Sequence, residues 1–253
     1  RTPQHPEPEA IIGGRMENSQ NRFAFVIPVY NHGGTVSMVV RQAQALGYPV
    51  FVVDDGSTDE TPLRLAEIQG IHLLRHAQNT GKGAAILTGF AAVSHVADFA
   101  ITIDADGQHY PEDALKLIAA IPENKRPLIV GARQGMDAVS GAHIPWTSRF
   151  GRKFSNFWVR MSGGPILSDS QSGMRIYPLP ESLNLDVQAR RFQFEVEVLV
   201  KAKRRGISVV EVPVRVVYQV GAARISHFHP FVDFWRNAKT FTRLILTRSV
   251  LHD

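Results

Sequence analysis

Short runs of consecutive apolar residues alternate with helical apolar stripes from Phe23 onward, and this alternation constrains the fold more than any other feature. Phe23–Val29 has the length and continuity of a strand buried on both faces. The next stripe follows Thr35, a residue that can cap a helix, and stops at Gly47, a type favoured at helix C-termini. The alternation predicts strand–helix units, and hence a mainly parallel sheet with helices on both faces.

Further apolar runs and stripes continue the series. Four more strands are predicted at 50–53, 71–74, 99–103 and 128–130. A helix is predicted from Thr61 as its cap, with Pro62 at its first position, to Gly70. Further helices are predicted at 81–96, 111–121, 146–161, 194–205 and 231–250. A last strand at 207–217 contains Pro213, which places that proline at a sheet edge or bulge.

Composition excludes several classes of protein. The chain is 44% apolar and 20% charged, as in ordinary globular proteins. It has no cysteine, which excludes disulfides, thiolate metal sites and a cysteine nucleophile. No stretch approaches the roughly 18 apolar residues of a membrane span, and the chain starts without Met, which leaves room for an upstream piece.

The first twenty residues differ from the rest. Pro3, Pro6, Pro8 and the Gly13-Gly14 pair punctuate a stretch with few apolar residues. We therefore expect a flexible tail at 1–20 and a single α/β domain at 21–253.

Positive charge is concentrated in the second half of the chain. Residues 1–132 carry a net charge of −4 and residues 133–253 a net charge of +9. This asymmetry indicates an anionic partner such as phosphate or anionic lipid, although solvated helix faces would also account for it.

Acidic residues follow two of the predicted strands. Asp54-Asp55 ends the second strand and Asp104-Ala105-Asp106 ends the fourth. Ligands of open parallel sheets bind outside the carboxyl ends of the strands, so these ends should meet at one crevice. The bland alternative for both is a plain strand-to-helix turn.

The spacing of Asp104 and Asp106 has a geometric meaning. In extended backbone, residues two apart point the same way, so both carboxylates can face one cation. Oxygen ligands of this kind suit Mg²⁺ or Mn²⁺, with substrate phosphate completing the shell. Gly81-Lys82-Gly83 resembles a phosphate loop loosely and serves equally well as a helix start.

Five motifs together resemble glycosyltransferase family 2, in particular its dolichyl-phosphate mannose synthase-like, polyprenyl-phosphate sugar transferase branch. They are Pro28-Val29-Tyr30-Asn31, Val53-Asp54-Asp55-Gly56-Ser57-Thr58-Asp59, Asn79-Thr80-Gly81-Lys82-Gly83, Asp104-Ala105-Asp106-Gly107-Gln108-His109 and Asp169-Ser170-Gln171-Ser172-Gly173-Met174-Arg175. The resemblance implies a GT-A type fold with a Rossmann-like sheet, a nucleoside-diphosphate sugar donor and a divalent metal, Mg²⁺ or Mn²⁺.

The resemblance also implies roles for single residues. The donor-nucleotide residues are Pro28, Tyr30, Asn31, Asp55, Lys82, Asp104 and Ala105. The metal ligands are Asp104, Asp106 and Gln108. The catalytic residues are Asp106, Arg133, Arg175 and Glu197. Glu195, two positions from Glu197, cannot share its helix face and is expected at the helix surface.

One segment departs from the pattern of that branch. The Gly-x-Ser-Lys segment expected after Glu211-Val212-Pro213 is replaced by Ser226-His227-Phe228-His229-Pro230, a form that looks like bacterial relatives. Mannose as the sugar and a dolichol-type acceptor are therefore left open.

Two mechanisms and one rival enzyme class remain open. An inverting transfer to a lipid phosphate needs no base, and Arg133, Arg175 and Arg224 suit it. Transfer to a hydroxyl of a lipid or glycan needs a base, for which Glu197 and Asp169 are the candidates. A GT-A-like nucleotidyltransferase is the alternative from another class, whereas the acidic crevice speaks against a nucleic-acid partner.

The predicted last helix carries an apolar stripe flanked by bases. The apolar residues are Phe231, Phe234, Trp235, Phe241 and Ile245, and the bases are Arg236, Lys239, Arg243 and Arg248. Such a helix either packs on the domain or lies in a membrane interface. We expect a cytoplasmic enzyme with peripheral contact to the inner face of the cytoplasmic membrane.

Overall fold

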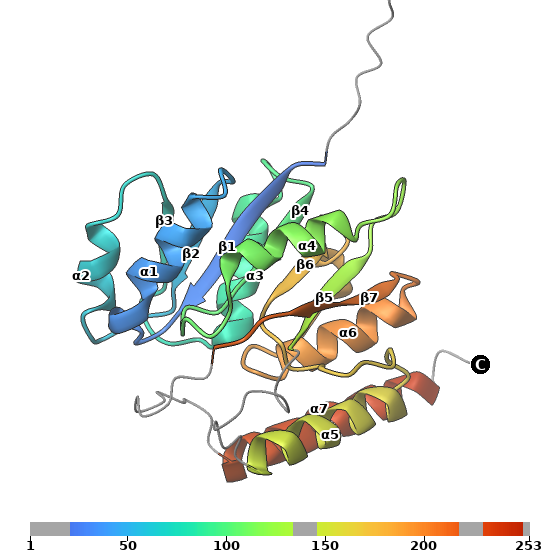
Figure 1. Ribbon diagram of the computed structural model, residues 1–253. Coiled ribbons are helices and arrows are strands. Elements are labelled where there is room, and N and C mark those ends of the chain that lie inside the picture. The colour runs from blue at the N-terminus through green and yellow to red at the C-terminus, as the bar shows by residue number, and fades with distance from the viewer. Residues whose placement is uncertain (1–20, 134–145, 218–229, 250–253) are drawn as a thin grey trace, which may run out of the picture.

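Seven strands form one sheet in the order β3-β2-β1-β4-β6-β5-β7 (Figure 1). The strands are β1 (Phe23–Val29), β2 (Val50–Asp54), β3 (His72–Arg75), β4 (Phe99–Thr102), β5 (Leu128–Arg133), β6 (Arg175–Pro178) and β7 (Val209–Val214). The helices are α1 (Gly33–Gln44), α2 (Thr61–Ala66), α3 (Lys82–Val93), α4 (Ala114–Ala119), α5 (Trp146–Met161), α6 (Phe194–Arg204) and α7 (Pro230–Ser249). The computed structural model describes residues 21–133, 146–217 and 230–249, so the expected tail at 1–20 lies outside them.

The expected mainly parallel α/β sheet is confirmed. β1 pairs in parallel with β2 and β4, β2 with β3, and β5 with β7. β6 alone runs antiparallel, between β4 and β5. The sequence did not predict β6 because it has only four residues and begins with a charged one, Arg175.

Helices cover both faces of the sheet, as the unbroken apolar runs predicted. Phe25 and Ile27 of β1 join the core beneath α1, whereas Ala24 and Val26 join the core beneath α3 and α6. Alternate residues of a strand point to opposite faces, so a strand buried on both sides needs apolar residues at every position.

Pro28 of β1 and Pro213 of β7 occupy positions that lack a second strand partner. Pro28 lies opposite Val53 of β2, beyond the last β1–β4 pair at Val26. Pro213 lies in β7, an edge strand of the described sheet, opposite Ala132. The missing N–H of proline costs little where one side of the strand is unpaired, and the edge prediction for Pro213 is confirmed.

The two helix caps predicted from threonines were wrong. α1 begins at Gly33, so Thr35 lies inside it and its hydroxyl donates to the carbonyl of Ala105 at 2.6 Å. Thr61 is the first residue of α2 rather than its cap. The carboxylate of Asp59 serves both helix starts instead, since it accepts the N–H groups of Gly33 and Thr61 at 3.1 and 2.9 Å.

α5 and α7 lie side by side below the sheet (Figure 1). Phe241 of α7 is only 4% exposed and stacks on Trp158 of α5, with the ring centroids 5.8 Å apart. The expectation that Phe241 could enter a membrane was therefore wrong, because that position packs on the domain. The side chains of Phe231, Phe234 and Trp235 lie outside the described ones. Among the described residues, no helix has the length and apolarity to cross a membrane.

Candidate active site

The carboxyl ends of β1, β2 and β4 meet at one edge of the sheet, as expected from the sequence. The backbone N–H of Asp55 donates to Val29 at 2.8 Å, and that of Asn31 donates to the Ser57 hydroxyl at 3.0 Å. The Thr35 bond to Ala105 then ties α1 to the loop that carries Asp104 and Asp106. The three sequence motifs therefore build one site.

An ion triad lies at the centre of this site, with Glu195 buried and Lys82 and Asp104 partly exposed. The Lys82 ammonium is 2.6 Å from the Asp104 carboxylate and 2.5 Å from the Glu195 carboxylate. Lys82 begins α3, and Glu195 lies in the first turn of α6. Glu195 is 5% exposed, so its expected place on the helix surface was wrong. Both Glu195 and Glu197 are buried because α6 is covered on more than one side.

The triad sets the charge states of its members. Burial opposes ionisation of Lys82, but Asp104 and Glu195 outweigh it and raise its pKa. Burial also opposes ionisation of Asp104, yet Lys82 keeps the pKa of that carboxyl below its usual value. The pKa of Glu195 is raised, since its deeper burial outweighs the same ammonium. Lys82 thus stays charged beside Asp104.

Asp106 and Gln108 complete the acidic loop. The Asp106 carboxylate accepts the backbone N–H of Gln108 at 3.0 Å. Burial and the nearby Asp104 charge raise the pKa of Asp106. His109 is buried next to both, and burial lowers its pKa. The charge of Asp104 thus opposes ionisation of Asp106, and a cation between the two carboxylates would relieve that repulsion.

Gly173 brings a second loop against Asp104. A Cβ built on Gly173 would lie 2.3 Å from Oδ2 of Asp104, so only glycine leaves room for the carboxylate. The Gly173 carbonyl accepts the Thr102 hydroxyl at 2.9 Å, which fixes the loop to β4. The 169–173 motif is therefore part of the same site.

Arg175 holds that loop from inside the protein. Its side chain is 0% exposed, and it donates to the carbonyls of Ser172, Glu195 and Ser170 at 2.7, 2.8 and 2.8 Å. The resemblance placed Arg175 beside the transferred group, but an enclosed guanidinium bound to backbone does not reach a substrate. Arg175 is a positioning residue that ties the loop to α6.

Arg133 lies at the end of β5 and is oriented by a buried acid. Its Nε and Nη2 donate to the two carboxylate oxygens of Asp169 at 2.6 and 2.9 Å. Asp169 is itself placed by Glu211, whose carboxylate accepts the N–H groups of Ser168 and Asp169. This two-pronged pairing fixes the direction of the guanidinium.

Asp55 organises the start of α3. Its Oδ1 accepts the backbone and hydroxyl of Thr80 at 2.9 and 2.8 Å, and its Oδ2 accepts the backbone of Gly81 at 2.7 Å. The ring of His76 contacts Oδ1 at 2.7 Å. The resemblance implied that Asp55 binds the nucleoside. In the structure its carboxylate accepts hydrogen bonds from the loop before Lys82.

The remaining donor-side residues lie at the same edge of the sheet. Pro28 is buried at the end of β1, and Tyr30 is half-buried just beyond it. Asn31 has a left-handed backbone with φ of 53°, and its side-chain oxygen accepts the Thr58 N–H at 2.8 Å. Ala105 is 1% exposed and contributes its carbonyl to Thr35. Asn31 and Ala105 thus accept hydrogen bonds that hold the loops after β2 and β4 in place.

Glu197 is separated from the triad although it lies on the same helix. Its side chain is 0% exposed, and its carboxylate accepts the N–H groups of Gln188 and Ala189 at 3.1 and 2.9 Å. Lys201 and Arg243 contact it at 3.1 and 2.5 Å. Expected as catalytic, Glu197 acts here as a structural anchor.

The sequence is similar to those of known glycosyltransferases. Residues 24–179 match the family model described as Glycosyl transferase family 2. The chain is 30% identical over 213 residues to the UDP-N-acetylglucosamine–dolichyl-phosphate N-acetylglucosaminyltransferase of Methanococcus voltae, covering 76% of this chain and 84% of that one. It is 30% identical over 207 residues to the polyprenol monophosphomannose synthase of Mycolicibacterium smegmatis, covering 76% of each.

The fold has a counterpart among solved structures. The glucosyl-3-phosphoglycerate synthase of Mycobacterium tuberculosis, in complex with Mn²⁺, uridine diphosphate and phosphoglyceric acid, matches with a TM-score of 0.64 and 18% identity. The match covers 90% of this chain and 78% of that one, and it confirms the expected GT-A type fold. The chain belongs to glycosyl transferase family 2 and is a glycosyltransferase.

Proposed function

We propose that the protein transfers a sugar, with inversion, from a nucleoside-diphosphate donor to a polyprenyl phosphate. The two relatives named above carry dolichyl phosphate and polyprenol monophosphomannose in their names, which supports a lipid-phosphate acceptor. Family membership replaces the nucleotidyltransferase alternative that the sequence left open.

Both candidate bases are already bound by protein donors, and this observation favours a phosphate acceptor over a hydroxyl acceptor. Asp169 is 0% exposed and bound by Arg133 through both oxygens, and Glu197 is 0% exposed and bound by four donors. A hydroxyl acceptor needs a group that can take its proton. A phosphate acceptor is already an anion and needs only positive charge and positioning, which favours the first of the two mechanisms.

Three oxygen-bearing side chains fit a divalent metal. Asp104 and Asp106 offer carboxylates and Gln108 an amide oxygen, a hard donor set suited to Mg²⁺ or Mn²⁺. Burial and the neighbouring Asp104 charge raise the pKa of Asp106, and a bound cation would relieve the repulsion between the two carboxylates. Among the described residues no three acid or histidine side chains converge as a metal cage, so donor phosphate oxygens would complete the shell. Such a metal supplies neutralisation of the diphosphate leaving group.

Protein cations supply the rest of the positive charge. Lys82 stays protonated beside Asp104, and the Arg133 guanidinium is held in one direction by Asp169. The two residues come from α3 and β5: Lys82 pairs directly with Asp104, and the Arg133 charge also lowers the pKa of the Asp104 carboxyl. Fixed cations near a bound diphosphate and an incoming phosphate would lower the barrier to displacement without reorganisation.

A two-part assay tests this function. UDP- and GDP-sugars are screened with Mn²⁺ or Mg²⁺ for a rise in melting temperature, and then for nucleoside-diphosphate release in the presence of polyprenyl phosphate. We expect release with polyprenyl phosphate and none with the matching polyprenol, which carries a hydroxyl in its place. Equal turnover with both lipids would refute the phosphate acceptor, and an unchanged anomeric configuration in the product would refute inversion.

A further inference from the structure

Arg243 of α7 and Glu197 of α6 grip the same short stretch of chain before α6. The Glu197 carboxylate accepts the backbone N–H groups of Gln188 and Ala189, and its Oε2 lies 2.5 Å from Nη2 of Arg243. Nη1 of Arg243 also donates to the side-chain oxygen of Gln188 at 2.6 Å. One guanidinium thus holds both a buried acid and the stretch that this acid anchors.

The same stretch packs directly on the start of α3. The carbonyl of Arg190 accepts the backbone N–H of Ala84 at 2.9 Å. A Cβ on Gly81 would lie 2.5 Å from that carbonyl oxygen, and one on Gly83 would lie 2.9 Å from the oxygen of Ala189. The two backbones are therefore in contact without room for a methyl group.

The start of α3 in turn forms one wall of the active site. Gly81 donates to the Asp55 carboxylate at 2.7 Å, and Lys82 pairs with Asp104 at 2.6 Å. Hydrogen bonds and close backbone contacts hence run without a break from α7 to Asp104.

We propose that Arg243 is a positioning residue for the donor site. Through Glu197 and Gln188 it presses the 188–191 segment onto the start of α3 and so holds Lys82 beside Asp104. α7 then contributes to the active site by positioning Lys82, although none of its described side chains lies in the site. That the site binds a sugar donor rests on the proposed function, whereas the structural link from Arg243 to Lys82 does not.

The ion pairs around Glu197 allow a variant that keeps the fold. Arg243 is 37% exposed, and Lys201 lies 3.1 Å from the other oxygen of Glu197. Removal of Arg243 therefore leaves the buried carboxylate with one cation and two backbone donors, so Arg243→Gln should fold. Arg243→Lys keeps the charge but cannot reach both Glu197 and Gln188, because it lacks the guanidinium fork.

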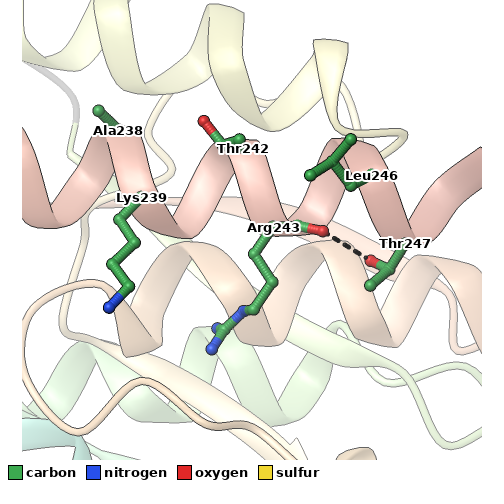
Figure 2. A pocket seen from close by; sticks show the side chains of 6 residues that line it. All are labelled: Ala238, Lys239, Thr242, Arg243, Leu246 and Thr247. Carbon is green, nitrogen blue, oxygen red and sulfur yellow. Dashed lines mark hydrogen bonds between the residues drawn. The ribbon is translucent and has the colours of Figure 1, made fainter.

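Lys239 provides the matched control. Figure 2 shows Lys239 and Arg243 extending from the same side of α7, one turn apart. Lys239 is exposed, and no ion pair of the described residues includes it. Lys239→Gln thus removes the same charge from the same face of the same helix.

Hydrogen–deuterium exchange tests the connection without any substrate. In Arg243→Gln we expect the amides of Gln188 and Ala189, and also that of Ala84, to exchange about tenfold faster than in the wild type, since their acceptors loosen. Arg243→Lys should fall between the two, and Lys239→Gln should match the wild type. Unchanged exchange at Ala84 in Arg243→Gln, or an equal rise in Lys239→Gln, would overturn the proposal.

Kinetic measurements then test whether Arg243 affects binding of the sugar nucleotide. Arg243→Gln should raise the KM for the sugar nucleotide by about three- to tenfold and leave the KM for the acceptor unchanged, because the loosened element carries Lys82. An unchanged donor KM despite faster exchange at Ala84 would overturn the positioning role. A wild type inactive with every donor would refute the proposed function alone, since the exchange data still decide the connection.

Discussion

Gly173→Ala is the substitution with the most direct expected effect on the acidic loop. The added methyl carbon would lie 2.3 Å from Oδ2, 2.5 Å from Oδ1 and 2.5 Å from Cγ of Asp104. Ordinary carbon–oxygen contacts start at about 3.3 Å, so the carboxylate must retreat by about 1 Å. Asp104 cannot do so freely, because it pairs with Lys82.

A displacement of this size has a known order of effect on rate. Misplacing a catalytic group by about 1 Å costs about a hundredfold in turnover, and overpacking costs about 1–3 kcal/mol of folding stability. We therefore expect Gly173→Ala to remain folded, with the rate of nucleoside-diphosphate release about a hundredfold below wild type at saturating Mn²⁺. The variant should also need more metal to reach half its maximal rate.

Gly34→Ala is the matched control for this experiment. A Cβ at Gly34 would meet nothing within 4 Å, and the residue lies in α1, where alanine is the better helix former. It should retain full activity with an equal or higher melting temperature. A rate for Gly173→Ala within threefold of wild type would refute the reasoning, because Asp104 would then not need its present position.

Three further outcomes are expected. Asp106→Asn should lower turnover by orders of magnitude with the fold intact, whereas the exposed Glu123→Gln should not; full activity in EDTA would contradict this. Burial alone would raise the pKa of Asp113, but hydrogen bonds from Arg215 and Lys116 lower it below its usual 3.8. Its stabilising contribution is therefore present above that pH and lost below it, so the melting-temperature gap between wild type and Asp113→Asn should close as the pH falls below 3.8. The membrane contact was expected at the last helix; we now predict that exposed residues of α5, Phe157 and Met161, which are 56% and 49% exposed, contribute to it. Changing both to serine should reduce sedimentation with anionic liposomes, whereas Leu63→Ser on α2, 71% exposed, should not.

The fold was predictable where burial on both faces leaves a periodic signal. β1 and β2 are unbroken apolar runs, and α5 begins and ends where its stripe predicted, at Trp146 and Met161. β6 escaped prediction because four residues starting with Arg175 carry no such signal, and its pairing with β4 comes from chain segments far apart. Long-range pairing of short strands is decided by the sheet that is already there.

The residues of the site could be predicted from the motifs, but the contacts between their side chains could not. The motifs brought Asp104, Asp106 and Lys82 forward, and the structure does place them together. Glu195 was missed because helical spacing suggested that only one of two acids two positions apart could be inside. α6 is packed against both the sheet and α7, so that restriction does not hold for it. A signal was available, since the residues between and beside the two acids are all apolar.

The basic second half of the chain has a different meaning in the structure than in the sequence. A net charge of +9 after residue 132 suggested an anionic partner. Several of these bases point inward: Arg175 binds three carbonyls, Arg204 binds the carbonyls of Ser162 and Leu244, and Arg133 binds Asp169. Such arginines donate to carbonyl and carboxylate oxygens of loops and helices, and so hold this half of the fold together. Charge count alone is thus weak support for a membrane or lipid phosphate, and the Lys82 ammonium, 2.6 Å from Asp104 within the candidate site, is the stronger reason to expect anionic substrates.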